Sequence, residues 1–373
     1  MTFEWYISDY LAEFDARNVE FVNYREGCLM TGVQCLFEAT GLEYYKNFIV
    51  RFGEKYVSDD GMIKGFDVDD YNVDRIRAGT VLFFLLNETG DLCYKKAIDI
   101  IMDNLRSYPR TSEGSFWHKS VYPYQVWLDG LYMAQPFYLL YDNAFENCAN
   151  YNDIVEQFKL VRKYMFCEEK KLYHHAWDEK RALSWADKET GRSPNFWLRA
   201  IGWWLMALVD CYDLIKEEAY DHRRVLQDLL NETVSGLMPY REKGSGMFYQ
   251  LVDLADVEGN YLETSGSAMV AYSLLKGSRN GMLLPEKYAP IAKEILLSIQ
   301  ANMLPWNNGF LSLQNICGGA GLSTHPEQGR YRDGSVAYYL AEKIVPDNLH
   351  GAAALFMAYA EYLKSCKLRD DLI

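Results

Sequence analysis

The stretch SPNFWLRAIGWWLMALVDCYDLI, residues 193–215, decides the fold, because it has the features of a long apolar helix with a marked start. Ser193 is a residue type that caps helix N-termini. Pro194 suits the first helical position, where its missing N–H is not needed. A long apolar run follows. We therefore predict a helix that begins at Ser193 and Pro194.

Stretches of the same kind recur along the chain. The clearest are VDRIRAGTVLFFLLNET (73–89), ETSGSAMVAYSLLKG (263–277) and DNLHGAAALFMAYAEYLKS (347–365). Strand signals are few and short, in YHHAWD (173–178), GMFYQLVD (246–253) and GGAGLS (318–323), and these could be short hairpins at a rim. No linker or low-complexity stretch divides the sequence, so we expect one all-α domain over residues 1–373.

A weak internal repeat suggests how the helices are arranged. A glycine stands near the start of an apolar run at Gly27, Gly79, Gly130, Gly202, Gly266 and Gly351, and a second helical segment follows, such as CYKKAIDIIMDNLRS (93–107) or YAPIAKEILLSIQANM (288–303). Six helical hairpins in a ring explain this pattern. The glycines would let inner helices approach closely, and the helix N-termini would point into one mouth. We predict an (α/α)6 barrel; the alternative is an irregular all-helical domain whose glycines only permit packing.

Charge and composition exclude several kinds of partner. The formal net charge is −14 and no block of Lys and Arg occurs, which argues against nucleic acid and anionic membranes. The N-terminus lacks a signal-peptide pattern, and no apolar run reaches the length of a membrane span. The eight cysteines are scattered, so we expect free thiols and a cytoplasmic location. We also expect a monomer or weak homo-oligomer. Aromatic residues make up 15% of the chain, which suits stacking on sugar rings.

The candidate chemistry lies in carboxylates beside aromatic rings. No His, Cys or acidic pattern predicts a metal site, and no nucleophile elbow or phosphate-binding loop occurs; GGAGLS does not open a helix. Asp129 lies in YPYQVWLDGLYM and Asp74 in YNVDRIRAG, each at a predicted helix start. Burial would raise the pKa of such a carboxyl, whereas a helix N-terminus would lower it. The ordinary role of either residue is a cap or a turn.

A basic residue and several rings follow on the helix of residues 193–215. Arg199 and Trp203 are four residues apart and share a helix face, close to Trp197. A guanidinium beside an indole suits a sugar carboxylate, although an arginine that fills space against tryptophan is as good an interpretation. His118 and His175 each stand near a tryptophan, where a core histidine is the ordinary role.

Five segments together resemble the glycoside hydrolase family of unsaturated rhamnogalacturonyl hydrolases (family 105), which is related to the unsaturated glucuronyl hydrolases (family 88). These segments are RTSEGSFWHKSVYPYQVWLDGLYMAQPF (110–137), LYHHAWDEKRALSWADKETGRSPNFWLRAIGWW (172–204), LETSGSAM (262–269), RDGSVAYYLAEKIV (332–345) and DNLHGAAAL (347–355). The resemblance extends from about residue 20 to the C-terminus. Its most specific parts are Trp-Leu-Asp-Gly and His-Ala-Trp-Asp in this order.

The resemblance implies an (α/α)6 barrel and a reaction without metal or cofactor on a small oligosaccharide. The substrate would carry a 4,5-unsaturated uronic acid, and the resemblance implies an unsaturated galacturonyl group attached to rhamnose in a pectin fragment. Asp129 would protonate C4 as general acid and base, Asp74 would support it, and His175 would place water or sugar. The implied sugar contacts are Arg199 and Trp203 at the uronate carboxylate, with Tyr24, His118 and Trp197 lining the pocket.

One segment departs from the family pattern. Where a histidine-rich approach to the first inner helix is expected, this chain has Asn23, Tyr24, Arg25 and Glu26, and Arg25 could change what is recognised beyond the uronate. The loop of residues 318–346 is expected to shape the pocket rim. The alternatives are an unsaturated glucuronyl hydrolase on other polysaccharides, an inverting glycosidase that uses Asp74 and Asp129, a sugar 2-epimerase on the same barrel, and a non-catalytic sugar-binding protein.

Overall fold

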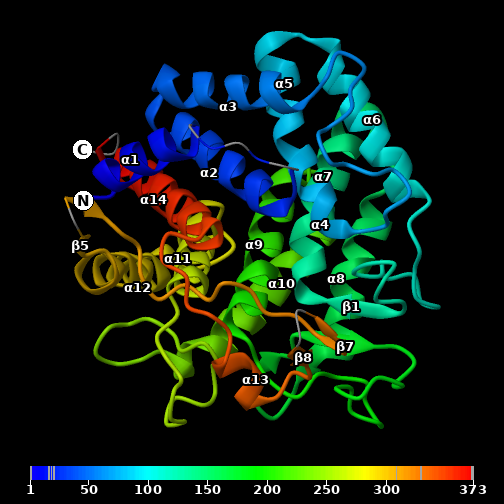
Figure 1. Cartoon of the computed structure of the whole chain (residues 1–373), viewed down its shortest axis with the longest axis vertical. Coiled ribbons are helices and arrows are strands. Elements are labelled where there is room, and N and C mark those ends of the chain that lie inside the picture. The colour runs from blue at the N-terminus through cyan, green and yellow to red at the C-terminus, as the bar shows by residue number, and fades with distance from the viewer. Residues whose placement is uncertain are drawn as a thin grey trace.

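Helices in two concentric layers dominate the computed structural model, which describes residues 2–15, 17, 19, 22–307, 309–327 and 330–370 (Figure 1). Within these residues, each segment of the inner layer packs on the next, and the last packs on the first. The chain is therefore an (α/α)6 barrel, as the sequence predicted. In ring order the inner segments are α2 (Tyr24–Thr40), α4 (Val73–Ile76) with its continuation α5 (Thr80–Thr89), α7 (Leu128–Phe145), α9 (Leu198–Leu214), α11 (Thr264–Arg279) and α14 (Leu349–Asp370).

The outer layer supplies one helix beside each inner segment. Its members are α1 (Phe3–Asp15), α3 (Glu43–Tyr56), α6 (Leu92–Arg106), α8 (Tyr151–Met165), α10 (Tyr220–Leu237) and α12 (Pro285–Ser298). The first helix lies against the last: the ring of Phe3 in α1 meets that of Tyr359 in α14 at 5.3 Å between centroids. Shorter pieces are the 3-10 turns η1 (Arg77–Gly79) and η2 (Met238–Tyr240), the π-helix η3 (Ile299–Met303) and α13 (Val336–Leu340).

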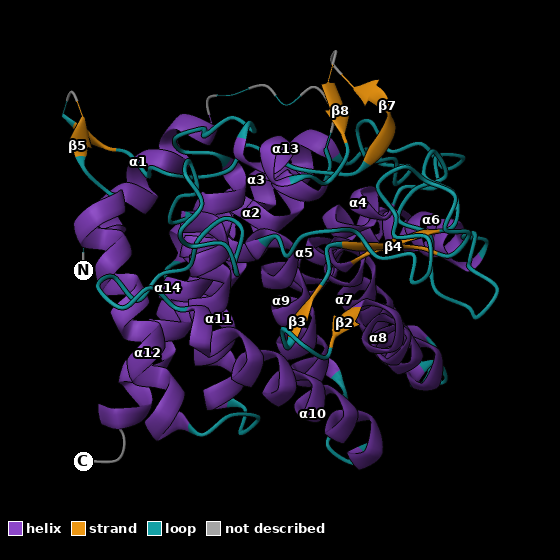
Figure 2. Cartoon of the chain, turned by 90° about the horizontal axis from the view of Figure 1, so that it is seen from below, coloured by secondary structure: helices purple, strands orange, loops and turns teal. Residues whose placement is uncertain are grey.

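Long loops and some of the short hairpins gather along the upper side of Figure 2. The antiparallel pairs are β1 (Gln125–Trp127) with β4 (Ala176–Asp178), β2 (Phe166–Cys167) with β3 (Leu172–Tyr173), β5 (Trp306–Asn307) with β6 (Phe310–Leu311), and β7 (Ser323–Glu327) with β8 (Arg330–Arg332). The pair β1–β4 matters most for the site, because its register sets Trp127 opposite Ala176. Hairpins were expected in the segments 173–178, 246–253 and 318–323. The first lies in β3 and β4, the second makes only isolated bridges, and only Ser323 of the third belongs to a strand, β7.

The predicted start of the helix at residues 193–215 is wrong. α9 begins at Leu198, and its N-cap position is Trp197. Ser193 does not cap the helix, because its hydroxyl accepts a hydrogen bond from the N–H of Ala176 at 3.1 Å. Its own N–H donates to the Ala176 carbonyl at 2.9 Å, so this residue continues the pairing of β4. The predicted helix at 73–89 is also interrupted, by η1.

Several of the repeat glycines mark close contacts between inner segments. A Cβ on Gly27 would lie 2.8 Å from the backbone N and Cα of Ala78, and one on Gly266 would lie 2.5 Å from the Leu198 side chain. A Cβ on Gly202 would meet Met269 at 2.6 Å. Gly130 differs, because the nearest atom to its Cβ would be at 3.5 Å. Close approach explains most of the repeat, but not every member.

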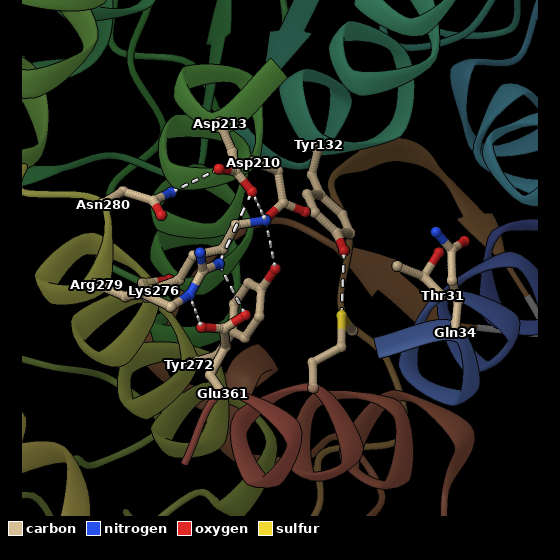
Figure 3. A network of polar contacts seen from close by, with 12 residues as sticks. Thr31, Gln34, Tyr132, Asp210, Asp213, Tyr272, Lys276, Arg279, Asn280 and Glu361 are labelled. Atoms are coloured by element: carbon tan, nitrogen blue, oxygen red, sulfur yellow. Dashed lines mark hydrogen bonds and ion pairs between the residues drawn. The ribbon is translucent and has the colours of Figure 1, made fainter. Parts of the chain in front are cut away.

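A buried charge network ties three inner helices together through their C-terminal halves (Figure 3). Lys276 of α11 binds Asp210 of α9 at 3.0 Å and Asp213 at 3.1 Å. Arg279 binds the carboxylate of Glu361 in α14 through two hydrogen bonds, of 2.7 and 3.1 Å. Glu361 is almost completely buried, and burial that would raise its pKa is outweighed by Arg279 and the nearby lysines, so its pKa is lowered. The network fixes α9, α11 and α14 against one another far from their N-termini.

Candidate active site

A cavity of about 560 Å³ opens where the N-terminal ends of α2, α4 and α7 meet. Its volume falls within the range of sites that hold drug-sized ligands. The segments 318–320 and 342–345 complete its wall, so the described part of the loop 318–346 shapes the rim; residues 328 and 329 lie outside the described residues. The lining residues are Tyr24, Arg25, Asp74, His118, Lys119, Tyr122, Trp127, Asp129, Met133, Gly318, Gly319, Ala320, Arg332, Glu342, Lys343 and Val345.

Asp129 and His175 form the most buried polar pair at this cavity. Asp129 Oδ2 lies 3.4 Å from His175 Nε2; the carboxylate is 13% exposed and the imidazole is completely buried. The β1–β4 pairing brings them together, because the N–H of Leu128 donates to the His175 carbonyl at 3.1 Å. On its other side, His175 Nδ1 lies 2.7 Å from the Tyr339 hydroxyl. The imidazole is thus held between a phenol and a carboxylate that faces the cavity.

Burial and the neighbouring groups act in opposite directions on the pKa of Asp129. Burial raises the pKa of this carboxyl, while contact with His175, the nearby His118 and a backbone N–H lower it. The lowering effects prevail, so the pKa of Asp129 is below its ordinary value. Its place in the first turn of α7, at the positive end of the helix dipole, acts in the same direction. The free site therefore holds Asp129 as a carboxylate at neutral pH.

Asp74 lies on the neighbouring helix start and is paired with a lysine. Its Oδ2 is 2.7 Å from Lys119 Nζ, and its Oδ1 is 3.9 Å from His118 Nε2. Asn72 caps α4 by accepting a hydrogen bond from the Asp74 N–H at 3.1 Å. The Val73 N–H donates to the His118 carbonyl at 3.2 Å, which fixes the segment that carries His118 against α4.

His118 forms one end of a stack of three rings. Its ring lies on Trp127 with 4.3 Å between centroids, and Tyr122 lies on Trp127 at 5.3 Å. Burial lowers the pKa of His118 to about 4, even though Asp74 acts in the opposite direction. The imidazole is therefore neutral at neutral pH. A stacked aromatic wall beside a carboxylate suits the apolar face of a sugar ring.

Tyr24 contributes a hydroxyl that is bound to a second buried histidine. Its oxygen lies 2.6 Å from His350 Nε2, which joins the starts of α2 and α14. Burial lowers the pKa of His350 well below its ordinary value, with the positive charges of Arg199 and Arg25 acting in the same direction. Burial and the charge of Asp74 raise the pKa of Tyr24. The pair is therefore a neutral hydrogen bond.

Arg199 is buried beneath the cavity rather than in its wall. Its guanidinium donates to the Cys317 carbonyl at 2.5 Å and to the Ser265 hydroxyl at 3.2 Å. From the other side, the buried carboxylate of Glu263 accepts a hydrogen bond from the Cys317 N–H at 3.0 Å. The two charged side chains thus hold the backbone N–H and the carbonyl of one residue, Cys317, directly before the cavity-lining Gly318. This geometry gives Arg199 a positioning role for that loop.

The two tryptophans expected beside Arg199 are also buried. The ring below the guanidinium is Trp197, at 4.8 Å from its centroid. Trp203, predicted to share a site with Arg199, stacks on Tyr132 of α7 at 5.1 Å between centroids. Neither indole lines the cavity. The structure brings Tyr24, Asp74, His118 and Asp129 to the cavity wall and places His175, Trp197, Arg199 and Trp203 behind it.

Several residues of the cavity were not singled out from the sequence as site residues. Trp127, Lys119 and Tyr122 stand in the same segment as Asp129, so their proximity could have been inferred. Lys343 and Arg332 come from the late loop, and nothing local marks them. Four basic residues line the cavity, Arg25, Lys119, Arg332 and Lys343, against three acidic ones. The chain as a whole has a net charge of −14.

The described part of the chain holds no other candidate site of the kinds considered from the sequence. There, no three His, Cys, Asp or Glu side chains form a group that could hold a metal ion. None of the described helices has the length and apolarity that crossing a membrane requires. All eight cysteines are free.

Comparison with known proteins shows what the chain is similar to. The model of Glycosyl Hydrolase Family 88 matches residues 5–366. Protein Atu3128 of Agrobacterium fabrum is 33% identical over 235 residues, which cover 62% of this chain and 98% of that protein. The unsaturated rhamnogalacturonyl hydrolase YesR of Bacillus subtilis is 27% identical over 259 residues, covering 68% of this chain and 70% of YesR.

The structural neighbours agree with these relatives. A family 105 glycoside hydrolase of C. acetobutylicum superposes with a TM-score of 0.92 at 35% identity, covering 97% of this chain and 99% of the other. An unsaturated glucuronyl hydrolase specific for heparin superposes with a TM-score of 0.71 over 98% of this chain and 96% of the other. Its identity is 13%, so this second likeness shows a shared fold alone.

Proposed function

The chain belongs to Glycosyl Hydrolase Family 88 and is a glycoside hydrolase of the unsaturated glycuronyl type, and we propose that it releases an unsaturated galacturonyl group from rhamnose in products of rhamnogalacturonan lyases. The likeness to YesR supports this choice of substrate. We propose further that residues 1–373 form a single catalytic domain, since α14 closes the ring on α2. A cytoplasmic location and a monomeric or weakly associated state stay predictions.

The observation that carries the proposed reaction is Asp129 on the cavity wall with His175 directly behind it. A carboxylate so placed can hold or deliver a proton, and the Tyr339–His175 contact keeps the imidazole fixed. The pKa of Asp129 is low in the free site. A uronate that enters beside it brings a like charge, which raises the pKa of Asp129. Substrate binding itself therefore favours the protonated, donating form.

The proposed reaction begins with hydration of the C4=C5 bond rather than attack on the anomeric carbon. The Asp129 carboxyl delivers its proton to C4, water adds its oxygen to C5, and Asp129 takes the proton that this water releases. The product is a hemiketal at C5. The hemiketal opens by cleavage of the bond from C5 to the ring oxygen, which leaves a ketone at C5 and a hemiacetal at C1. The hemiacetal then expels the remaining sugar as an alcohol.

The other residues receive roles that follow from their contacts. Asp74 and His118 bound the cavity beside Asp129, where we propose that they orient water and sugar hydroxyls. Tyr24 is proposed to bind the sugar through its hydroxyl. Direct contact of Arg199, Trp197 and Trp203 with the uronate stays a prediction, and the buried position of Arg199 favours a role through the Cys317 peptide.

The ultraviolet absorbance of the conjugated double bond provides the test. Purified protein is mixed with unsaturated rhamnogalacturonyl and unsaturated glucuronyl disaccharides, and the loss of absorbance is followed. We expect faster loss on the rhamnogalacturonyl substrate. The variant Asp129→Asn should be slower by about 10²- to 10⁴-fold, because general acid–base catalysis contributes roughly this much.

A matched control separates chemistry from folding. Asp210→Asn changes another buried aspartate, on α9 within the charge network, and should lower stability while activity at a permissive temperature persists. Faster turnover of the glucuronyl disaccharide would replace the proposed substrate with the alternative one. Cleavage of saturated glycosides would indicate an inverting glycosidase, and a product of unchanged mass would indicate an epimerase. No reaction with any unsaturated uronide would refute the proposal.

A further inference from the structure

Two basic side chains in the cavity have no part in the proposed chemistry. Arg25 is the second residue of α2, and Lys343 lies in the segment after α13; both line the cavity. Within the described residues, neither side chain makes a hydrogen bond or ion pair. Lys119 differs from them, because its ammonium group is paired with Asp74. In the described part of the chain, the cavity therefore offers two cations without a direct acidic partner.

The backbone that carries both residues is fixed. Asn23 and Glu26 form a reciprocal capping box at the start of α2, in which Asn23 accepts from the Arg25 N–H at 3.0 Å and Glu26 accepts from the Asn23 N–H at 3.1 Å. The backbone of Lys343 is paired with that of Gly318, because its carbonyl accepts a hydrogen bond from the Gly318 N–H at 2.7 Å. Each side chain thus extends from an anchored point into the cavity.

The net charge of the whole chain affects how an anionic ligand can be held at these cations. With a net charge of −14, the protein repels anions at long range, so an anionic ligand must be held by local contacts. Arginine binds planar oxyanions such as carboxylate or sulfate through two hydrogen bonds, and lysine adds a point charge. The unsaturated uronate supplies one carboxylate. In the reactive complex Asp129 is protonated, so four cations face two carboxylates, those of Asp74 and Glu342, and the surplus is one positive charge more than the uronate requires.

We infer that the cavity binds a second oxyanion of the substrate, a carboxylate or a sulfate carried beyond the unsaturated uronate, and that Arg25 and Lys343 bind it. This inference rests on the proposed function and narrows it to acidic oligosaccharides with at least two negative charges. It also gives a role to the segment that departs from the family pattern, Asn23 to Glu26.

The test compares three unsaturated substrates by loss of absorbance. The first is a disaccharide whose second sugar is neutral, the second extends it by a sugar with a carboxylate, and the third carries a sulfate on the second sugar. We expect kcat/KM to be about 10- to 100-fold higher on one or both charged substrates, because a charge-assisted hydrogen bond strengthens binding by about this factor. The two charged arms distinguish carboxylate from sulfate. This preference should shrink as salt is raised.

In the double variant Arg25→Gln with Lys343→Gln, the ratio of kcat/KM on charged substrates to kcat/KM on the neutral substrate should fall close to one. The control Arg224→Gln, whose side chain is 77% exposed on α10, should leave that ratio unchanged. Equal turnover of neutral and charged substrates by the unaltered enzyme would overturn the inference and leave the proposed function intact. A preference that survives in the double variant would also overturn it. If no unsaturated substrate reacts, the proposed function fails, and this inference fails with it.

Discussion

His118 makes the stability of the fold depend on pH, and the size of the effect follows from its burial. In the folded protein its pKa is lowered from 6.5 to about 4. As the pH falls from 6.5 toward 4, the unfolded chain binds a proton at this residue and the folded chain does not, so the free energy of unfolding decreases. Between pH 7 and pH 5 this difference amounts to about 2 kcal/mol for His118 alone.

The variant His118→Phe removes this titration while keeping a flat ring against Trp127. Urea unfolding at pH 7 and pH 5 measures the effect. The decrease in the free energy of unfolding between the two pH values should be about 2 kcal/mol smaller in the variant than in the unaltered protein.

The control is Tyr122→Phe, which changes the other end of the same stack without removing a group that titrates between pH 5 and 7. It should show the same pH-dependent decrease as the unaltered protein. An equal decrease in His118→Phe would refute the reasoning, because it would mean that folding does not hold His118 neutral.

Four further substitutions test the packing and the loop. Gly27→Ala places a Cβ within 2.8 Å of the Ala78 backbone and should lower the free energy of unfolding by about 1–3 kcal/mol. Gly130→Ala, whose Cβ has its nearest atom at 3.5 Å, should raise the free energy of unfolding by about 0.5–1 kcal/mol. Urea unfolding that gives both variants a change of the same sign contradicts this. Glu361→Gln leaves Arg279 with only a distant acidic partner, Asp213 at 3.9 Å, and should lower the free energy of unfolding by roughly 3 kcal/mol. A change below about 1 kcal/mol would show that the network contributes little. Arg199→Lys weakens the hold on the Cys317 carbonyl, so the Gly318 amide should exchange hydrogen faster and KM should rise about tenfold; unchanged exchange argues against a positioning role.

The fold was largely predictable, because apolar helices with glycines near their starts need no knowledge of distant contacts. The start of α9 was not. Ser193 and Pro194 carry a strong local signal, yet the segment pairs with β4 on one side, and Trp197 forms a bridge with Leu251 on the other. Backbone hydrogen bonds to β4 and to the segment around Leu251 outweigh the gain from one cap, and these partners cannot be read from the local sequence.

The site was predictable in its residue types and only partly in its geometry. Asp129 and Asp74 lie at helix starts on the cavity, as their sequence positions suggested. The spacing of Arg199 and Trp203 suggested a shared function, but α9 is buried on all sides, and its residues reach different neighbours. Trp203 meets α7, while Arg199 reaches Ser265 of α11. A helix without an exposed face gives no sequence signal for which neighbour each side chain contacts.

The closure of the ring by α14 on α2 has a consequence for how the protein is made. A ribosome adds about 5–20 residues per second, so α2 emerges well before α14. Until α14 emerges, the apolar faces of α2 and α11 that it covers stay open to water and to other nascent chains. A chain truncated before residue 349 leaves those apolar faces of α2 and α11 exposed permanently. The docking of α14 on α2 and α11 is thus the step that closes the ring and covers these apolar faces.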